Sequence, residues 1–390
     1  MFDSNAFIPI AKPYMDEREA EAARRAILSA WVSQGPEVAA FERDFAAAVG
    51  AKHACAVSSA TAALHLALRA VGVRPGDEVI TVSHSFIATS NSIRHCGAKP
   101  VFVDIQPGTY NIDPAFIEAA TTSRTRAILC VHQMGMPCDL AAVLKIAGRY
   151  ALPLVEDAAC ALGSEIKVDG HWQKIGKPQG DVACFSFHPR KIITTGEGGM
   201  LTTAHPDYDK KFRLWRQNGM SISDTQRHRT PEVIFESYPE LGFNYRMTDI
   251  QAAIGREQLK RLPELIGRRR YLADRYQKGL GDVLGLSLPE TPAWAKTNWQ
   301  SYCVRLPDDC DQKGLMQAML DSGIASRRGI MCAHREAACQ EDIQVCGSLL
   351  ESEAAQDHCI LLPLYPSMTA CEQDRVIALV KHVLQKNAPL

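Results

Sequence analysis

The sequence lacks an excess of charge of either sign. It has 43 Lys and Arg against 44 Asp and Glu in 390 residues, which gives a formal net charge of −1. A balance this close to zero provides no electrostatic footprint for nucleic acid or for an anionic membrane surface. It leaves room for a local basic pocket that binds a small phosphorylated molecule.

The sequence also lacks long hydrophobic runs, internal repeats and low-complexity segments. No apolar stretch approaches the ~20 residues of a membrane span, and the first 14 residues contain no apolar core of signal-peptide length. The 13 Cys are odd in number and spread from Cys55 to Cys371, unlike the paired framework of a small secreted protein. We therefore expect a cytoplasmic protein with reduced thiols that binds neither membrane nor nucleic acid.

Short apolar runs that are rich in β-branched residues alternate with helix-like stretches over the first two-thirds of the chain. The strand-like runs are Cys55–Val57, Glu78–Val82, Pro100–Val103, Ala127–Val131, Pro153–Val155 and Val182–Phe187. The helix-like stretches are Ala62–Val71, Ala88–Cys96, Pro114–Ala120 and Leu140–Arg149. This alternation predicts βαβ units and a mostly parallel sheet with helices on both faces. Ligands of such sheets bind beyond the carboxyl ends of the strands, so the residues after each run are the candidates for a site.

The pattern changes after Arg246, which predicts a second domain. We expect a large α/β domain over residues 1–250, whose first ~15 residues pack on the smaller domain, and a small α+β domain over residues 251–390. The elements expected in and before the small domain are helices at Asp249–Leu262, Arg268–Arg275, Lys313–Ser322 and Glu372–Gln385, and strands at Ser301–Leu306 and Cys359–Leu362.

Two segments that follow strand-like runs suit a flat, phosphorylated ligand. Ser58–Ala63 opens a helix with small and hydroxyl residues, whose N–H groups and dipole can bind an anion. The same residues also make an ordinary N-cap. Phe86 follows Glu78–Val82, where its ring can stack on a ligand or pack in the core.

Two further segments carry an acid and an amine. Asp157 ends an apolar run, where a carboxylate is costly unless paired, so it holds a cationic ring nitrogen, caps a helix or forms an ion pair. Lys191 lies between a buried strand-like run and the glycine-rich turn Gly196–Gly199. A lysine among apolar and small residues is suited to Schiff-base formation with a carbonyl, although a lone lysine is usually a solvated surface charge. The four segments together supply what pyridoxal phosphate requires.

The sequence carries a set of motifs that occur together in one family. The motifs are Ile8–Tyr14, Trp31–Pro36, Gly76–Ile80, Gly97–Asp104, Glu156–Ala159, Ser186–Lys191, Thr194–Gly199, Gly242–Thr248 and Gln251–Gly255. Over nearly its whole length the chain resembles the DegT/DnrJ/EryC1/StrS family of pyridoxal-phosphate-dependent sugar aminotransferases. The resemblance implies fold type I of the pyridoxal-phosphate-dependent transferases, an α/β architecture with a mostly parallel central sheet flanked by helices and a smaller C-terminal α+β domain.

The resemblance assigns cofactor roles position by position. Lys191 matches the lysine that forms the Schiff base with the cofactor, and Asp157 matches the acid that pairs with the pyridine nitrogen. The other matched cofactor positions are Ser186, Ala60 and Thr61 on the phosphate and Phe86 on the ring.

One matched position implies a partner subunit. Asn244 matches an asparagine that reaches the phosphate from the neighbouring subunit, with Arg246 close by. The resemblance therefore implies a homodimer with shared active sites. One position departs from the family, because Cys160 stands where many members have Gln or His on the cofactor's phenolic oxygen, and a thiol is a weaker hydrogen-bond partner.

The implied reaction moves an amino group from glutamate to a keto group of a nucleotide-linked deoxy sugar, in amino-sugar biosynthesis. Arg190, Arg327 and Arg328 are candidates for the diphosphate, and His188 and His334 for sugar hydroxyls. Alternatives are an aminotransferase for a cyclitol or free keto sugar, a pyridoxal-phosphate-dependent sugar dehydratase, in which the lysine is typically replaced by His, and a non-catalytic pyridoxal-phosphate-binding regulator.

A metal site is the other chemistry that the sequence suggests. Cys332, Cys339 and Cys346 lie near His334. Their seven-residue spacing lacks the close Cys pair of a zinc site, so we expect no metal.

Overall fold

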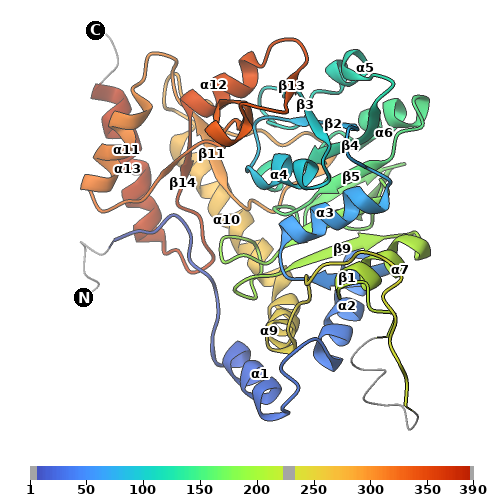
Figure 1. The fold of residues 1–390 in the computed structure, drawn as a ribbon. Helices are drawn as coiled ribbons and strands as arrows, with labels where there is room; N and C mark the ends of the chain where they lie inside the picture. The colour runs from blue at the N-terminus through green and yellow to red at the C-terminus, as the bar shows by residue number, and fades with distance from the viewer. Residues whose placement is uncertain (1–6, 223–232, 387–390) are drawn as a thin grey trace.

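A mixed eight-stranded sheet forms the centre of the molecule (Figure 1). The structure is a computed structural model and describes residues 7–222 and 233–386. In spatial order the strands are β1 (His53–Val57), β9 (Gly199–Thr203), β8 (Val182–Ser186), β5 (Leu154–Asp157), β4 (Thr125–Val131), β2 (Glu78–Val82), β3 (Lys99–Val103) and β13 (Gln344–Val345). Among these strands only β9 runs in the direction opposite to the others. The prediction of a mostly parallel sheet is confirmed.

Helices cover both faces of the sheet, as the alternation predicts. Those of the first two-thirds of the chain are α1 (Glu17–Leu28), α2 (Pro36–Val49), α3 (Ala60–Ala70), α4 (Ala88–His95), α5 (Ile117–Ala120), α6 (Leu140–Arg149) and α7 (Pro206–Trp215), with 3₁₀ turns η1 (Pro114–Phe116) and η2 (Gln133–Gly135). All six expected strands and all four expected helices of this region are present within a few residues. Strand β9 was not predicted, because it follows a glycine-rich turn and is buried at all five positions, which removes the alternation of a half-buried strand.

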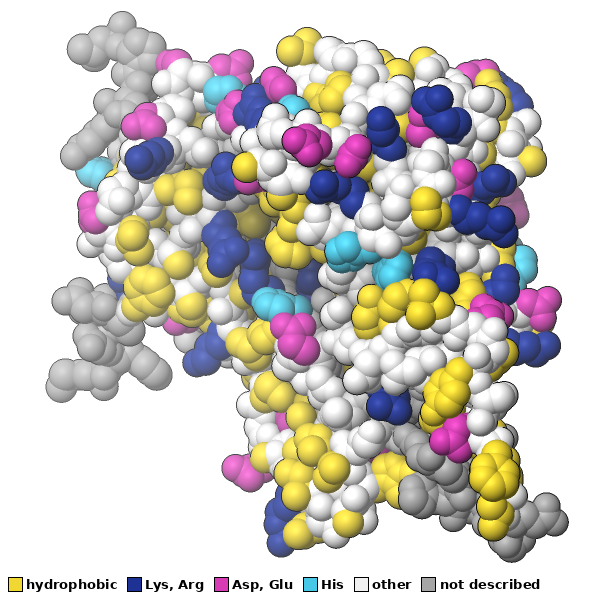
Figure 2. Space-filling model, viewed as in Figure 1, with side chains coloured by type: hydrophobic (Ala, Val, Ile, Leu, Met, Phe, Trp, Pro, Cys, Tyr) yellow, Lys and Arg dark blue, Asp and Glu magenta, His cyan; other side chains and the backbone are white. Residues whose placement is uncertain are grey.

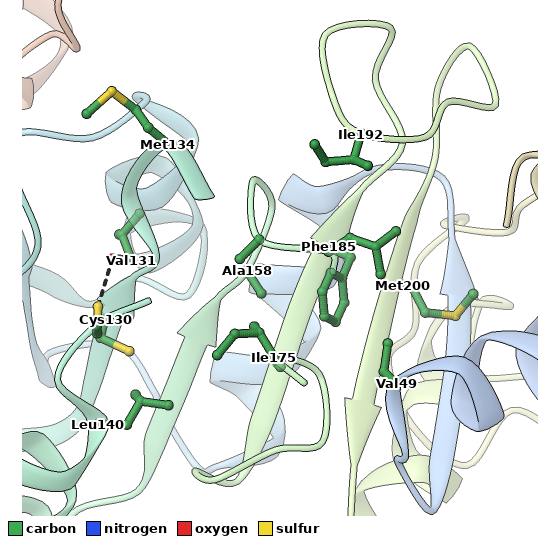
Figure 3. Packing of buried hydrophobic residues seen from close by; sticks show 14 of the residues in the cluster. Val49, Cys130, Val131, Met134, Leu140, Ala158, Ile175, Phe185, Ile192 and Met200 are labelled. Carbon is green, nitrogen blue, oxygen red and sulfur yellow. Dashed lines mark hydrogen bonds between the residues drawn. The ribbon is translucent and has the colours of Figure 1, made fainter. Parts of the chain in front are cut away.

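Alternate residues of each strand point to opposite faces and build two apolar layers. On one face, Val155 and Leu201 pack with the buried side of α3. On the other face, Phe185 of β8 and Met200 of β9 lie opposite each other across the strand pair and pack near Val49 of α2 (Figure 3). Burial on both faces makes this sheet a rigid base for the segments that leave its carboxyl edge.

The C-terminal third forms a further apolar cluster around a small sheet. Its elements are α9 (Asp249–Lys260), α10 (Leu262–Leu280), β10 (Ala295–Lys296), β11 (Tyr302–Arg305), α11 (Gln312–Asp321), β12 (Arg327–Arg328), η3 (Ala333–Arg335), η4 (Ala337–Cys339), α12 (Leu350–His358), β14 (Cys359–Leu362) and α13 (Ala370–Lys386). Strands β11, β14 and β12 form an antiparallel sheet, while β10 pairs with β6 (Glu165–Val168), which pairs with β7 (His171–Lys174).

The start of the chain and the C-terminal third are in contact. Ile8 forms an isolated bridge with Ile324 and is fully buried in the same apolar cluster as α10 and β14. A segment of the C-terminal third also contacts the large sheet, because β13 pairs with its edge strand β3. Residues 1–6 of the predicted N-terminal segment lie outside the described residues, and the domain boundary near residue 250 stays a prediction. No described helix is both long and apolar enough to cross a membrane.

Candidate active site

The candidate residues gather at the carboxyl edge of the central sheet. Asp157 is the last residue of β5, and Ser186 is the last residue of β8. Phe86 lies in the turn between β2 and α4, and Ala60 begins α3 directly after β1. Since these four strands point the same way, residues from distant parts of the sequence lie at one edge, where parallel sheets bind their ligands.

Asp157 is a buried carboxylate, with 6% of the residue exposed. The hydroxyl of Thr89 donates to its Oδ2 at 2.9 Å, and the backbone N–H of Ala159 donates to its Oδ1 at 3.1 Å. No described cation forms an ion pair with it. Burial raises the pKa of Asp157 above its ordinary value, although both hydrogen bonds and the charge of Lys191 oppose that shift. A cationic ring nitrogen would supply the missing partner.

Thr89 was not among the predicted site residues, although it is the only described side chain that donates to Asp157. Thr89 lies in the first turn of α4 and is 2% exposed. Its hydroxyl is also 2.8 Å from the hydroxyl of Ser85. The segment containing it was recognised for Phe86, but the sequence carries no signal that a hydroxyl 68 residues before the acid would reach it.

Lys191 and Cys160 are in direct contact. The Nζ of Lys191 donates to the Sγ of Cys160 at 3.0 Å. Lys191 leaves β8 through the turn that begins at His188, and its backbone N–H donates to the His188 carbonyl at 2.8 Å. Cys160 lies in the turn after β5. Both residues are half-buried, so the amine is shielded yet open to a small carbonyl compound.

The N-terminus of α3 offers an anion cradle at the same edge of the sheet. Ser59 is the N-cap, and its hydroxyl accepts from Ala62 at 3.1 Å, so the capping role considered from sequence is present. That cap occupies one N–H only, and no described residue accepts from the N–H of Ala60 or Thr61. A Cβ placed on Gly199 would lie 2.4 Å from the Ser59 carbonyl, so glycine is required for β9 to pass this close.

Phe86 and Asn244 are both exposed in the single chain. Phe86 is 70% exposed, which leaves its ring free to cover a flat ligand. Asn244 is exposed and pairs with Gln217 through an isolated bridge. The carbonyl of the adjacent Tyr245 accepts from the N–H of Ser58 at 2.8 Å, so this segment is tied to the residue that precedes the cradle.

Cationic side chains lie next to Lys191. Burial and the charges of Lys191, Arg190 and Arg327 lower the pKa of His188, while Glu197 opposes that shift. Burial and Arg327 also lower the pKa of Arg190, whose Nε is buried without a hydrogen-bond partner. Arg327 is exposed on β12 and has no carboxylate partner within the described ranges. The adjacent Arg328 pairs with Glu336 at 3.3 Å.

The surface view agrees with a basic hollow. Figure 2 shows Lys and Arg side chains gathered in a depression between the part of the molecule that carries α11 and α13 and the part that carries α3 and α4. The net charge of −1 is therefore unevenly distributed. A local concentration of cations of this kind favours an anionic ligand.

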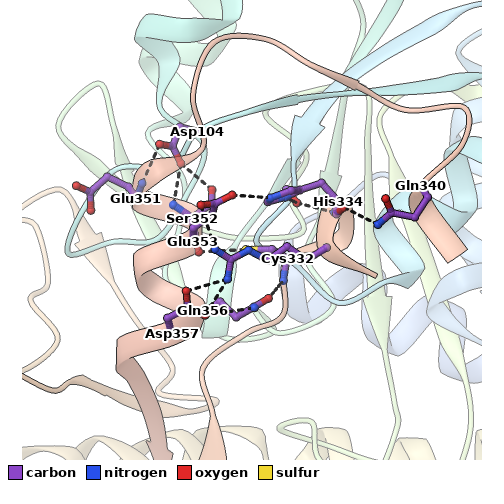
Figure 4. A network of polar contacts seen from close by, with 11 residues as sticks. Asp104, Cys332, His334, Gln340, Glu351, Ser352, Glu353, Gln356 and Asp357 are labelled. Carbon is purple, nitrogen blue, oxygen red and sulfur yellow. Dashed lines mark hydrogen bonds and ion pairs between the residues drawn. The ribbon is translucent and has the colours of Figure 1, made fainter. Parts of the chain in front are cut away.

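His334 lies in a separate polar network (Figure 4). Its Nδ1 is 2.7 Å from the hydroxyl of Ser83, and its Nε2 is 2.9 Å from Glu353. Both ring nitrogens are therefore engaged within the protein. Glu353 also pairs with Arg335, so this network joins α12 to the end of β2.

A buried pair beneath Asp157 supports the strand that carries it. The Nε2 of His132 is 3.1 Å from Glu156, and both side chains are fully buried. The N–H of Cys138 donates to the Nδ1 of His132 at 3.0 Å, which makes Nε2 the protonated nitrogen. Glu156 also accepts from the N–H groups of Gln179 and Gly180. These contacts connect the strand that ends at Asp157 to the segment after β4 and to the segment before β8.

The residues present suit pyridoxal phosphate. A buried acid without a cationic partner, unoccupied N–H groups at α3 and a shielded amine match the ring nitrogen, the phosphate and the aldehyde of that cofactor. No group of three or more metal-ligating side chains occurs in the described part of the chain. The fold and this donor set are those of a pyridoxal-phosphate-dependent enzyme.

The comparisons with known proteins identify the family. The chain belongs to the DegT/DnrJ/EryC1/StrS aminotransferase family, whose model matches residues 13–381. It is 36% identical to the spore coat polysaccharide biosynthesis protein SpsC of Bacillus subtilis over 98% of each chain. The structure matches DesV of S. venezuelae with a TM-score of 0.87 and 32% identity, over 97% of this chain and 99% of that one.

A further similar solved structure is a PLP form. The PLP form of a putative sugar aminotransferase, Spr1654 from Streptococcus pneumoniae, matches with a TM-score of 0.88 and 28% identity, over 98% of this chain and all of that one. The predicted family, fold class, enzyme class and cofactor are confirmed.

Proposed function

We propose that the protein transfers an amino group from glutamate to a keto group of a nucleotide-linked deoxy sugar, in amino-sugar biosynthesis. The observation that carries the proposal is the pair of cationic side chains Arg190 and Arg327 near Lys191, with His188 beside them. Neither arginine has a carboxylate partner among the described residues. A diphosphate supplies the two negative charges that such a pair binds.

Pyridoxal phosphate supplies an electron sink that stabilises negative charge at the carbon losing its proton. Lys191 would hold the cofactor, and its amine would carry the proton as a general acid and base. Asp157 is the carboxylate that keeps the ring nitrogen protonated, and Thr89 holds it in place. Ala60, Thr61 and Ser186 bind the phosphate, and Phe86 covers the ring.

The relatives support a sugar substrate. SpsC is named for polysaccharide biosynthesis, and PseC of Helicobacter pylori is an aminotransferase in the biosynthesis of pseudoaminic acid, matched here at 26% identity with a TM-score of 0.89. The proposal extends this sugar chemistry to the present chain. It also keeps the cytoplasmic location, because all 13 cysteines are unpaired.

A homodimer with shared sites is part of the proposal. The side chain of Asn244 is exposed. The contact between its segment and the cradle of the same chain is the hydrogen bond from the N–H of Ser58 to the carbonyl of the adjacent Tyr245. In a dimer, its exposed side-chain amide would reach the cofactor phosphate bound by the second copy. Arg246, two residues later, would lie close to the same phosphate. Size-exclusion chromatography with light scattering tests this point, and a monomer with full activity would contradict it.

The test of the function is a substrate panel. The purified chain is loaded with pyridoxal phosphate and given glutamate, and we expect the absorbance of the lysine-bound cofactor to be lost. Nucleotide-linked 4-keto and 3-keto deoxy sugars, with matched cyclitol and free keto-sugar acceptors, are then assayed for amine transfer. Lys191→Ala should lose both the absorbance and turnover. Transfer to the free acceptors alone, or turnover by Lys191→Ala, would overturn the proposal.

A further inference from the structure

Asn298 connects the C-terminal part of the chain to the turn that carries Cys160. Its side-chain amide donates to the carbonyl of Cys160 at 2.8 Å and to the carbonyl of Leu162 at 2.9 Å. Its side-chain oxygen accepts from the N–H of Gln300 at 2.9 Å. The residue is fully buried and lies between β10 and β11. Every hydrogen of its amide group is therefore used to hold the turn after β5.

The same segment holds the turn that carries Lys191. The side chain of Gln300 donates to the carbonyl of Arg190, the residue before Lys191, at 2.8 Å. Asn298 and Gln300, two residues apart, thus fix the backbones on the two sides of the contact between Cys160 and Lys191. The thiol comes from the turn after β5 and the amine from the turn after β8, so their approach depends on how these two turns are held.

The segment itself is rigidly placed. Trp299 has a left-handed backbone with φ of 54°, which is uncommon for a residue with a Cβ. Arg269 of α10 donates to the carbonyls of Trp299 and Gln300, at 3.2 Å each. The hydroxyl of Ser164 accepts from the N–H of Asn298 at 3.0 Å. Strained backbone persists where the surroundings determine it, as they do here.

Gly135 lies close to the side chain of Asn298 on its other side and restricts the orientation of the amide. A Cβ placed on Gly135 would lie 1.9 Å from the Asn298 side-chain oxygen. Gly135 has φ of 92°, and its carbonyl accepts from the Ser164 hydroxyl at 2.6 Å. The amide is enclosed by groups that match its donors and acceptor, which is the arrangement of a group with one orientation.

We propose that Asn298 is a positioning residue for the amine of the cofactor lysine: it holds the Cys160 turn, with Gln300 holding the Lys191 turn, so that the thiol contacts the amine. This inference deepens the proposed function, because it assigns a task to the thiol that replaces the usual Gln or His. Asn298, Trp299 and Gln300, which precede β11 of the small C-terminal sheet, then determine the position of the Lys191 amine.

The test is a mutant cycle on thiol reactivity in the full-length chain freed of cofactor. Alkylation of Cys160 by iodoacetamide is followed by mass spectrometry of its peptide. Because the Nζ of Lys191 lies 3.0 Å from the sulfur, a positive charge there assists the attack of the sulfur on iodoacetamide, and Lys191→Ala should slow alkylation by about threefold or more. In the Asn298→Ala background the same lysine change should leave the rate unaltered. An equal slowing in both backgrounds, or no slowing in either, would overturn the proposal.

Two further variants keep the test decisive. Gln300→Ala releases the other turn and should also remove the dependence on Lys191, which serves if Asn298→Ala does not fold. Asn111→Ala is the matched control, because Asn111 is equally buried and donates to the carbonyls of Met136 and Pro137 at 3.1 and 2.8 Å. It should retain the full dependence on Lys191, and loss of that dependence would assign the effect to general loosening and overturn the proposal.

The outcome is separable from the proposed function, since alkylation requires no turnover. In the loaded chain, Asn298→Ala should in addition shift the absorption spectrum of the lysine-bound cofactor, while Asn111→Ala should not. A chain that passes the cycle but transfers no amino group to any sugar would contradict the proposed function alone.

Discussion

The hydroxyl of Thr89 donates to the carboxylate of Asp157 at 2.9 Å, from a helix that follows a different strand of the sheet. Asp157 is buried and meets no cation in ion-pair geometry within the described residues. The hydrogen bond therefore provides part of the stabilisation of its negative form. A carboxylate that must stay charged to hold a ring nitrogen depends on such donors.

Replacing Thr89 by Val should weaken the site without changing its shape. The isosteric change removes a hydrogen bond to a charged group, worth about 1.5–3 kcal/mol, which corresponds to about tenfold or more in rate or affinity. We expect the turnover number and the affinity for pyridoxal phosphate to fall, measured by steady-state kinetics and cofactor titration. Thr89→Ser keeps the hydroxyl and should keep most of the activity. Wild-type behaviour of Thr89→Val would refute the role.

Asp157→Asn should separate activity from stability. Burial raises the pKa of Asp157, so in the cofactor-free chain this group costs stability as the pH rises from its unfolded value of about 3.9 through the higher folded value. At neutral pH the cofactor-free Asp157→Asn chain should melt at an equal or higher temperature than the wild type. Its turnover should fall by orders of magnitude. Near-normal turnover would contradict the assignment of the acid.

The two adjacent arginines of β12 should behave differently. Arg327 lies near Arg190 and His188, whereas Arg328 pairs with Glu336 at 3.3 Å. Arg327→Ala should raise KM for the nucleotide sugar about tenfold, as expected for one lost charge-assisted contact, and leave the glutamate half-reaction unchanged. Arg328→Ala is the control and should change KM little. Equal effects of the two variants would remove the support for a diphosphate subsite at Arg327.

Glu42 should make stability depend on pH in the acid range. Burial alone would raise its pKa, but Arg216 and Arg213, the latter 2.7 Å away, hold the pKa of Glu42 below its ordinary value. Its contribution is therefore present above the unfolded value of about 4.3 and is lost as the pH falls through the lower folded value.

Breaking this buried group of charges should be costly at neutral pH. Glu42→Gln leaves Arg216 buried without its charge partner, and we expect a loss of about 3 kcal/mol in the free energy of unfolding. Urea unfolding at several pH values measures it, and the difference from wild type should shrink below about pH 4. A difference that is independent of pH would show that the charge of Glu42 contributes nothing.

The local pattern of the sequence predicted six of the eight strands of the central sheet. Apolar runs such as Glu78–Val82 and helix-like stretches such as Leu140–Arg149 fall on β2 and α6 with matching bounds. Strand β9 was missed, because complete burial removes periodicity and the preceding glycines suggest a turn. Strand β13 has two residues and pairs only with a strand more than two hundred residues earlier, so no local signal exists for it.

The residues of the candidate site also fall into those that were predicted from the sequence and those that were not. Lys191 and Asp157 were predicted from their places at or after the ends of apolar runs, and Ser186 from the family resemblance. The structure places Asp157 and Ser186 at the ends of β5 and β8, on one edge of the sheet, and Lys191 in the turn after β8. Their roles remain part of the proposed function. Thr89 and Asn298 could not be predicted, because they reach Asp157 and Cys160 across 68 and 138 residues of sequence.

The sequence by itself determined which elements form and which chemical groups follow the strands, because period, turn residues and burial act over a few neighbouring residues. Only the tertiary structure decided which polar groups meet. It engaged both ring nitrogens of His334 with Ser83 and Glu353, and it left Arg327 without a carboxylate partner in the described chain while pairing Arg328. Which polar groups meet depends on how distant segments of the chain pack together, because a hydrogen bond forms only when its donor and acceptor lie within a few ångströms of each other.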